Sequence, residues 1–257
     1  MIMTDYDFRV DCTRNDPVYR DREMDAYSNT LYDYHRELWT KPLPSSNGEE
    51  FTLVKRGKIL YHNSNLGAFK LSSDSIGQTY TYWKEFARIF EEIRKDAKQK
   101  ALQEKFFTLC CTIGGFIIFP KDEVNYSDDP NKPKCASINA FRGMDRQICD
   151  RFDLTLDYIR MYYKNRDRKE RGRSNMERLL NGLSSFLDLF TDFQGYVDFF
   201  LLNDLVESDY SEIKFLCPVH PVLPNRTVDD YIKYRENLTS FINSRKNKIE
   251  NNQKIDL

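Results

Sequence analysis

The stretch FTLVKRGKILYHNSNLGAFKL (residues 51–71) decides the predicted fold. It contains three short runs with the composition of β-strands, over residues 51–54, 59–61 and 68–71. Gly57 and Gly67 fall between these runs and indicate tight turns. Connections this short join antiparallel neighbours, because a parallel pair needs a crossover of about a dozen residues or more. The stretch therefore predicts a small antiparallel meander.

Three further runs are candidates for strands. Residues 112–119 (TIGGFIIF) are apolar and β-branched after two glycines, and we expect a central strand there. Residues 212–216 are a candidate for the same sheet, and residues 136–139 are another short candidate. Gly114 and Gly115 allow another backbone to approach closely, so they indicate a bulge or, alternatively, a ligand on that strand edge.

Helical spacing of apolar residues surrounds the predicted strands. The predicted helices cover residues 28–39, 79–109 with a break near Asp96, 146–163, 175–206 with a joint at Gly195, and 227 onward. Thr227 and Asp230 fit a capping box at the start of the last helix. Together these elements predict an α+β fold, with a small, mainly antiparallel sheet packed against several helices and a helix-rich C-terminal half.

Composition narrows the class of protein. Lys and Arg number 39 and Asp and Glu number 40, so no net field would draw the whole chain onto nucleic acid. The longest uncharged apolar run, residues 109–120, is shorter than the roughly 20 residues of a membrane span. We expect a cytoplasmic protein with no membrane partner. Its predicted parts are an irregular arm (1–27), one α+β domain (28–251) and a frayed tail (252–257).

The six cysteines form no C-x-x-C pair, and with only three histidines the spacing of a zinc site is missing. Buried, reduced, structural thiols are the expectation. No metal ligand is predicted from the cysteines and histidines, and the sequence identifies no cofactor.

Six blocks stand out along the chain: YHRELWTKPLP (34–44), LGAFKLSSDSIG (66–77), TIGGFIIFP (112–120), SINAFRG (137–143), DRFDLTLDYIRMYY (150–163) and DFQGYVDFFLLNDLV (192–206). In this order they resemble an uncharacterised family of bacterial cytoplasmic proteins, a domain of unknown function. The resemblance implies a single-domain protein and brings no activity or catalytic residue with it. The chain departs from the family pattern at residues 164–174, where a less basic linker is expected.

The predicted helix over residues 146–163 carries the first candidate site. Five polar residues share one of its faces at spacings of 4, 3, 4 and 3: Arg146, Asp150, Asp153, Asp157 and Arg160. One interpretation is a solvated face with ion pairs, Arg146 with Asp150 and Asp157 with Arg160. The other is a polar cleft or a divalent-cation site. In a catalytic cleft, Asp153 and Asp157 are the catalytic candidates, and Arg146 and Arg160 bind substrate.

Residues 137–143 (SINAFRG), just before that helix, are the second candidate. Free amides and the helix dipole favour an anion at such a position, and Asn139 and Arg142 are candidate ligands for a phosphate. The alternative is a tight turn in which Arg142 pairs with a carboxylate. The spacing is not that of a P-loop or a dinucleotide fingerprint.

Residues 72–75 (SSDS) are typical of caps and Asx-turns. A nucleophilic serine there would need a base, and His35 and His62 are the candidates. His35, beside Trp39, is the preferred catalytic histidine, with a packed core histidine as the alternative.

Residues 164–173 (KNRDRKERGR) indicate a solvated linker or a local phosphate or nucleic-acid contact. This loop is the one nucleic-acid signal in the sequence, and it lacks the aromatic residues on which bases stack.

Asp198 lies inside the apolar segment YVDFFLL (196–202). A buried carboxylate needs a partner, and we expect Arg151 or Arg160 to supply it. The alternative is a carboxylate of raised pKa at a cleft.

Two functions remain open on these grounds. One is an enzyme acting on a phosphorylated small molecule, a nucleotide or nucleic acid, with a cleft formed by the candidate residues above. The other is a non-catalytic interaction protein, for example a component of a bacterial defence or stress module. The two differ in whether polar groups from different segments meet in one concave pocket.

Overall fold

The computed structural model describes residues 2–12, 24, 28–44, 49–56, 59–77, 84–120, 122–124, 134–136, 151–166, 183–217 and 227–255. Its α-helices are α1 (Arg9–Cys12), α3 (Asn29–Trp39), α4 (Lys84–Lys95), α5 (Ala97–Cys110), α7 (Phe152–Lys164), α9 (Ser184–Asp188), α10 (Phe193–Phe199) and α11 (Val228–Ile255). Two 3-10 turns, η2 (Ile113–Gly115) and η3 (Asn203–Leu205), join them. The strands are β1 (Val54–Arg56), β2 (Ile59–Ser64), β3 (Gly67–Ser75), β4 (Phe116–Pro120), β5 (Asp122–Val124) and β6 (Lys134–Ala136).

The predicted α+β fold is confirmed. Strands β1 to β4 form one sheet in that order, and each neighbouring pair is antiparallel. Leu60 pairs with Leu71 across β2 and β3, and Ser73 pairs with Ile118 across β3 and β4. The meander over residues 51–71 is therefore confirmed, although its first strand begins at Val54 rather than at Phe51.

Two strand predictions were wrong. β4 is the last strand in the order of the described sheet, not a central one. Its five residues are nevertheless all buried, because helices pack on both sides of it, and this burial accounts for its apolar sequence. Residues 212–216 form no described strand, since a single bridge between Val206 and Ile213 is their only ladder contact. Of residues 136–139, Ala136 ends β6 and the remainder lie outside the described residues.

Local capping rules explain where several helices begin. The Ser28 hydroxyl accepts a hydrogen bond from the Leu31 amide at 3.1 Å and starts α3. Asp96 separates α4 from α5, as predicted, and its carboxylate accepts from the Gln99 amide at 3.0 Å. Thr227 and Asp230 form the predicted capping box, with both reciprocal hydrogen bonds at 3.1 Å. α11 then runs to Ile255, beyond the predicted end of the helix.

Helix α7 begins six residues later than predicted. Arg151, the residue before it, has φ −119° and pairs with Gly77 in an isolated bridge. The Phe152 amide also donates to the Ile76 carbonyl at 2.8 Å, so Arg151 and Phe152 are held against the chain at residues 76–77. Of the predicted polar stripe, Asp153, Asp157 and Arg160 lie in α7, whereas Arg146 and Asp150 fall outside the described residues.

Gly195 is not a joint between helices. It lies in the first turn of α10, and its amide donates to the Asp192 carboxylate at 2.8 Å. The chain instead turns at Thr191, which has a φ of 68°. A Cβ on Gly195 would lie 2.2 Å from the Phe190 carbonyl oxygen, so glycine is required for this close approach.

The described N-terminal residues 2–12 contact the helices. They include α1 and bury Phe8 completely, with the Phe8 amide donating to the Cys111 carbonyl at 3.0 Å. Closer to the N-terminus, Asp5 pairs with Lys246 of α11. The segment therefore packs onto the helices rather than standing apart from them.

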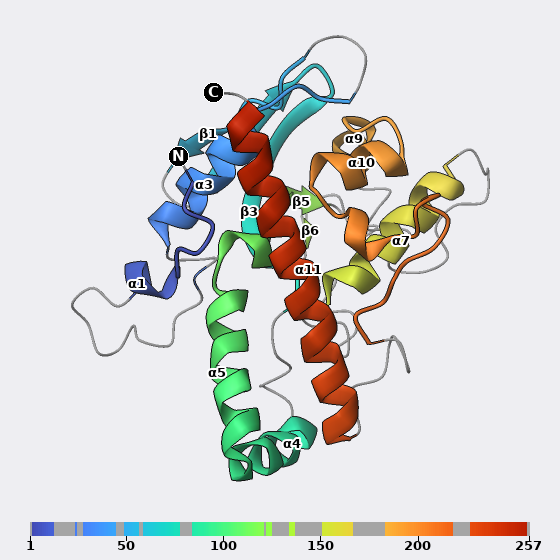
Figure 1. Ribbon diagram of the computed structural model, residues 1–257. Helices are drawn as coiled ribbons and strands as arrows, with labels where there is room; N and C mark the ends of the chain where they lie inside the picture. The colour runs from blue at the N-terminus through green and yellow to red at the C-terminus, as the bar shows by residue number, and fades with distance from the viewer. Residues whose placement is uncertain are drawn as a thin grey trace.

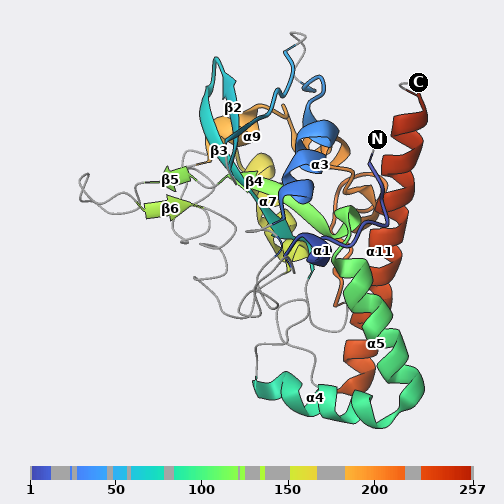
Figure 2. The same cartoon turned by 90° about the vertical axis from the view of Figure 1, so that its left-hand side faces the viewer.

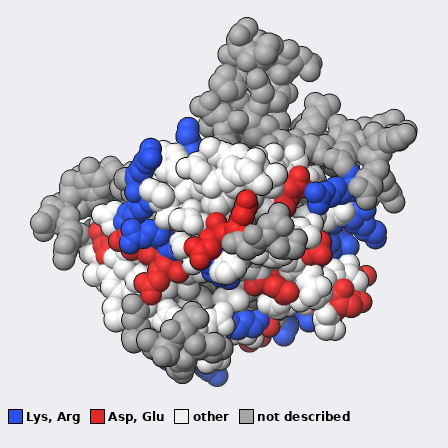
Figure 3. Space-filling model, turned by 90° about the horizontal axis from the view of Figure 1, so that it is seen from above, with Lys and Arg blue, Asp and Glu red and all other residues white. Residues whose placement is uncertain are grey.

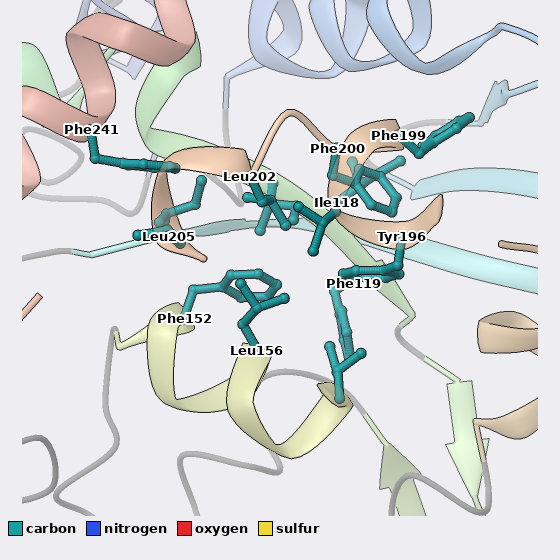
Figure 4. Packing of buried hydrophobic residues seen from close by; sticks show 14 of the residues in the cluster. Ile118, Phe119, Phe152, Leu156, Tyr196, Phe199, Phe200, Leu202, Leu205 and Phe241 are labelled. Carbon is teal, nitrogen blue, oxygen red and sulfur yellow. The ribbon is translucent and has the colours of Figure 1, made fainter. Parts of the chain in front are cut away.

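Helix α11 runs the length of the molecule and passes beside α5, while the sheet and the α7–α10 group lie near its upper half (Figures 1 and 2). Gly114 allows α11 to approach closely, although the predicted bulge is instead the turn η2. A Cβ on Gly114 would lie 2.7 Å from the Ile242 carbonyl oxygen of α11. In β4, Phe119 packs with Phe152 of α7, so this strand is part of the core (Figure 4).

Candidate functional site

The structure contains a groove of about 610 Å³ along α11. Its lining comes from three parts of the chain, namely η3, the segment 213–216 and α11. The lining residues are Asp204, Leu205, Ile213, Lys214, Phe215, Leu216, Lys233, Asn237, Ser240, Phe241 and Ser244. This volume lies within the range of roughly 300–1,000 Å³ that is usual for small-molecule sites.

Helix α11 gives the groove its polar wall. Lys233, Asn237, Ser240 and Ser244 follow spacings of 4, 3 and 4, so they share one face of the helix. Asn237 and Ser244 are half-buried, and Ser240 is exposed. Phe241 is buried beside them and adds apolar surface to the same wall. The wall therefore combines one cation with hydroxyl and amide groups.

The opposite wall, residues 213–216, is held in place by α7. The Leu216 amide donates to the Asp153 carboxylate at 2.8 Å. Asn237 of α11 donates to the Leu216 carbonyl at 3.0 Å. Just ahead of this wall, Arg160 donates to the Ser211 carbonyl at 2.8 Å. Asp153 and Arg160, which the sequence analysis singled out, thus hold the backbone of this segment in position.

Asp204 forms one end of the groove and is ionised there. Burial opposes its charge, but hydrogen bonds from Lys248 at 2.6 Å and Ser244 at 2.8 Å outweigh this effect and lower its pKa. Lys214, in the opposite wall, forms an ion pair with Glu207 at 3.4 Å. This end of the groove therefore has balanced charge, whereas Lys233 lies farther along α11 toward its N-terminus.

The polar residues of α7 form ion pairs. Arg151 holds Asp153 through two hydrogen bonds, Nε to Oδ1 at 2.7 Å and Nη2 to Oδ2 at 2.5 Å, and both side chains are buried. Asp157 pairs with Arg160 at 2.7 Å at the surface, as one sequence interpretation expected. Asp153 and Asp157 therefore differ in burial and in partners. Their catalytic role stays a prediction, and these contacts favour positioning roles.

His35 is completely buried between α3 and the sheet. The Trp39 indole donates to its Nδ1 at 3.0 Å, and since an indole N–H can only donate, the neutral ring carries its proton on Nε2. Nε2 then donates to the Ser73 hydroxyl at 2.8 Å. The sequence paired this histidine with residues 72–75, and the structure brings them together. The direction of this bond is opposite to the one a general base needs, so the geometry favours a packed histidine.

The buried environment of His35 predicts a pH dependence of stability. Burial and, secondarily, the charge of Arg245 lower the pKa of His35 from 6.5 to about 3. The unfolded chain therefore takes up the proton first, and stability that is present above about pH 6.5 is lost below it. The expected loss is about 1.4 kcal/mol per pH unit. His62 acts in the same direction, because burial also lowers its pKa.

Urea denaturation between pH 7 and 5 measures this slope, and NMR titration of the imidazole rings assigns it. We expect the His35 ring signals of the folded protein to stay constant down to about pH 5. A folded-state midpoint near 6.5 for His35 would contradict the prediction.

The predicted pairing of Asp198 with Arg151 or Arg160 was wrong, because these arginines pair with Asp153 and Asp157. Its side chain is exposed and accepts hydrogen bonds from the Tyr210 hydroxyl at 2.8 Å, from Asn203 and from Gln194. Helix α10 ends at Phe199, so Leu201 and Leu202 do not continue its face. The short helix turns its apolar residues inward and leaves Asp198 outside.

The remaining predicted ligands fall outside the described residues. These are Asn139, Arg142 and Arg146, together with residues 167–173 of the basic loop. At the start of that loop, Arg166 pairs with Asp188 at 2.8 Å. Acidic and basic side chains are interspersed on the described part of the face seen from above (Figure 3). Within the described ranges, no group of three or more His, Cys, Asp or Glu is placed to hold a metal ion.

Sequence reasoning missed Arg245, the most buried cation on α11. It lies three residues after Ile242 and four before Ile249, inside the apolar stripe of the helix, and this position was the available signal. It is completely buried, and its Nη1 donates to the Phe116 carbonyl at 2.6 Å and the Gly114 carbonyl at 3.1 Å. Its Nε donates to the Phe200 carbonyl at 3.1 Å.

A family model described as a family of unknown function (DUF6994) matches residues 2–249, and the chain belongs to this family. The resemblance to a domain of unknown function is thereby confirmed. No curated protein and no solved structure matches the chain. None of the helices in the described ranges has the length and apolar character needed to cross a membrane.

Proposed function

We propose that the groove along α11 binds a phosphate-bearing small molecule. The observation that carries the proposal is the convergence of three separate segments on one cavity of ligand size with polar walls. Lys233 supplies the charge for a phosphate, and Ser240 and Asn237 supply hydrogen bonds beside it. Phe241 and Leu216 supply apolar surface for the body of the ligand.

The proposal places the ligand in a bacterial cytoplasm. The resemblance to bacterial cytoplasmic proteins supports this, as do the cysteines. Cys12, Cys110, Cys111 and Cys217 are buried thiols, and burial raises the pKa of Cys110 and Cys111, which keeps them unreactive.

Thermal unfolding in the presence of mononucleotides, sugar phosphates and their unphosphorylated counterparts tests this function. We expect a phosphorylated compound to raise the melting temperature and its unphosphorylated counterpart to have a smaller effect, because a ligand of the folded state stabilises it by mass action. Ser240→Trp should abolish the shift by filling the groove, and Lys233→Ala should reduce it. Lys105→Ala, which changes an exposed lysine of α5, is the control and should leave the shift intact.

The absence of any shift across the phosphorylated set would contradict the proposal and favour the non-catalytic interaction protein. A shift that Ser240→Trp leaves unchanged would place the ligand elsewhere on the protein.

A further inference from the structure

The groove along α11 has a fixed order of contacts along its length. Asn237 donates to the Leu216 carbonyl at 3.0 Å, so the opposite wall reaches the helix at this residue. Ser244 donates to Asp204 at 2.8 Å, so the carboxylate lies at the level of this serine. Lys233 lies eleven residues before Ser244. At the rise of an α-helix, the lysine and the carboxylate are therefore separated by about 16 Å of helix.

Asp204 offers an unused acceptor to the groove. Lys248 Nζ at 2.6 Å and Ser244 Oγ at 2.8 Å both donate to its Oδ2. Its Oδ1 accepts no hydrogen bond from the residues that the structure describes, and the side chain is 39% exposed, so a ligand can reach it. Because Lys248 already balances the charge of the carboxylate, Oδ1 favours a neutral N–H or O–H donor over a second cation.

The surface beside Asp204 is apolar. Leu205 follows it in the sequence, and the Lys214 amide donates to the Leu205 carbonyl at 2.8 Å, which brings the neighbouring Ile213 to this end of the groove. Phe241 lies three residues before the serine that binds Asp204 and completes the apolar lining. Such a surface favours the flat face of an aromatic ring.

The other end and the middle of the groove are polar. The Lys233 side chain is 59% exposed and its ion pair with Glu236 is long, at 4.0 Å, so its charge is available to a phosphate. The Ser240 hydroxyl and the Asn237 carbonyl oxygen have no hydrogen-bond partner among the described residues. Both are neutral groups that suit the hydroxyls of a sugar.

We propose that the ligand of the groove is a nucleotide whose base carries an exocyclic amino group, as adenine and cytosine do. This inference rests on the proposed function and follows the order of groups along α11. The phosphate lies at Lys233, and the ribose lies at Asn237 and Ser240. The base lies against Phe241, and its amino group donates to Asp204 Oδ1, as cytosine donates to carboxylates in nucleic-acid recognition.

Calorimetric titration of the full chain with adenosine 5′-diphosphate and inosine 5′-diphosphate tests the proposal. Inosine has a carbonyl oxygen in place of the amino group, and this oxygen cannot donate to Asp204. We expect the adenosine compound to bind about tenfold tighter, as one hydrogen bond to a charged group predicts. Cytidine and uridine 5′-diphosphates form a second matched pair, and we expect the same preference for the amino base.

Asp204→Asn should reduce the ratio of affinities to about threefold or less, because an asparagine amide can donate to the inosine carbonyl. Asp33→Asn is the control, because it makes the same change on α3, outside the groove, and it should keep the ratio.

Equal affinities within both pairs of diphosphates, or a ratio that Asp204→Asn leaves unchanged, would overturn this inference and leave the groove as a phosphate site. If unphosphorylated adenosine bound as tightly as its diphosphate and lost affinity in Asp204→Asn, the base contact would be supported and the proposed phosphate site contradicted. The absence of binding by all the nucleotides and by adenosine would overturn the inference.

Discussion

Replacing Arg245 with methionine is expected to lower the free energy of unfolding by about 3–5 kcal/mol. Methionine keeps much of the volume but cannot donate to the carbonyls of Gly114, Phe116 and Phe200. Each carbonyl left buried without a donor costs roughly 1–3 kcal/mol. Part of this loss is offset, because methionine also removes the desolvation penalty of a buried charge.

Urea denaturation of the variant measures this loss as a lower midpoint with an unchanged slope. Arg36→Met is the matched control, because Arg36 is about half exposed and its ion pair with Asp33 is long, at 3.8 Å. The control should change stability by no more than about 0.5 kcal/mol. Wild-type stability in the Arg245 variant would contradict the prediction. It would mean that the desolvation penalty of the guanidinium cancels the stabilisation from all its hydrogen bonds.

Arg245 also shows why some of the fold followed from the sequence and some did not. Ser28, Asp96 and the pair Thr227 and Asp230 cap helices through contacts within three residues, so their sequence pattern contains the whole interaction. The partners of Arg245 lie about 45 and 130 residues away along the chain, and no local pattern contains them.

The prediction that Asp198 is a buried carboxylate was wrong for a related reason. Asp198 has apolar neighbours in sequence, but burial depends on where the helix stops and which way it faces. α10 ends after seven residues and leaves Asp198 outside. Asp153 lies in the first turn of α7, and that start is fixed by the pairing of Arg151 with Gly77 in the sheet.

The candidate groove was also out of reach of sequence reasoning. The polar stripe of α11 is visible as residues at spacings of 4, 3 and 4, but the same pattern is typical of a solvated face. Only the tertiary fold places segment 213–216 opposite it. Asp153 and Arg160 were singled out as direct site residues, and the structure gives them contacts with the backbone of residues 211–216 instead.

Replacing Asp153 with asparagine is therefore expected to destabilise the protein by about 3–5 kcal/mol. The amide keeps the shape of the side chain but not its charge, so the buried Arg151 guanidinium loses the carboxylate that accepts two of its hydrogen bonds. The amide N–H groups must also face a donor, namely Arg151 Nε in one orientation or Arg151 Nη2 and the Leu216 amide in the other. Both effects act in a region without solvent to compensate.

Asp157→Asn, one helical turn away, is the matched control, because Asp157 and Arg160 are partly exposed and such pairs contribute at most about 1 kcal/mol. Urea denaturation compares the stability of the two variants. The rise in melting temperature on adding ligand measures binding in the groove of each variant. We expect Asp153→Asn to weaken ligand binding in molecules that remain folded, because Leu216 is then free to move. Equal stability of the two variants would show that the buried pair offsets only its own desolvation.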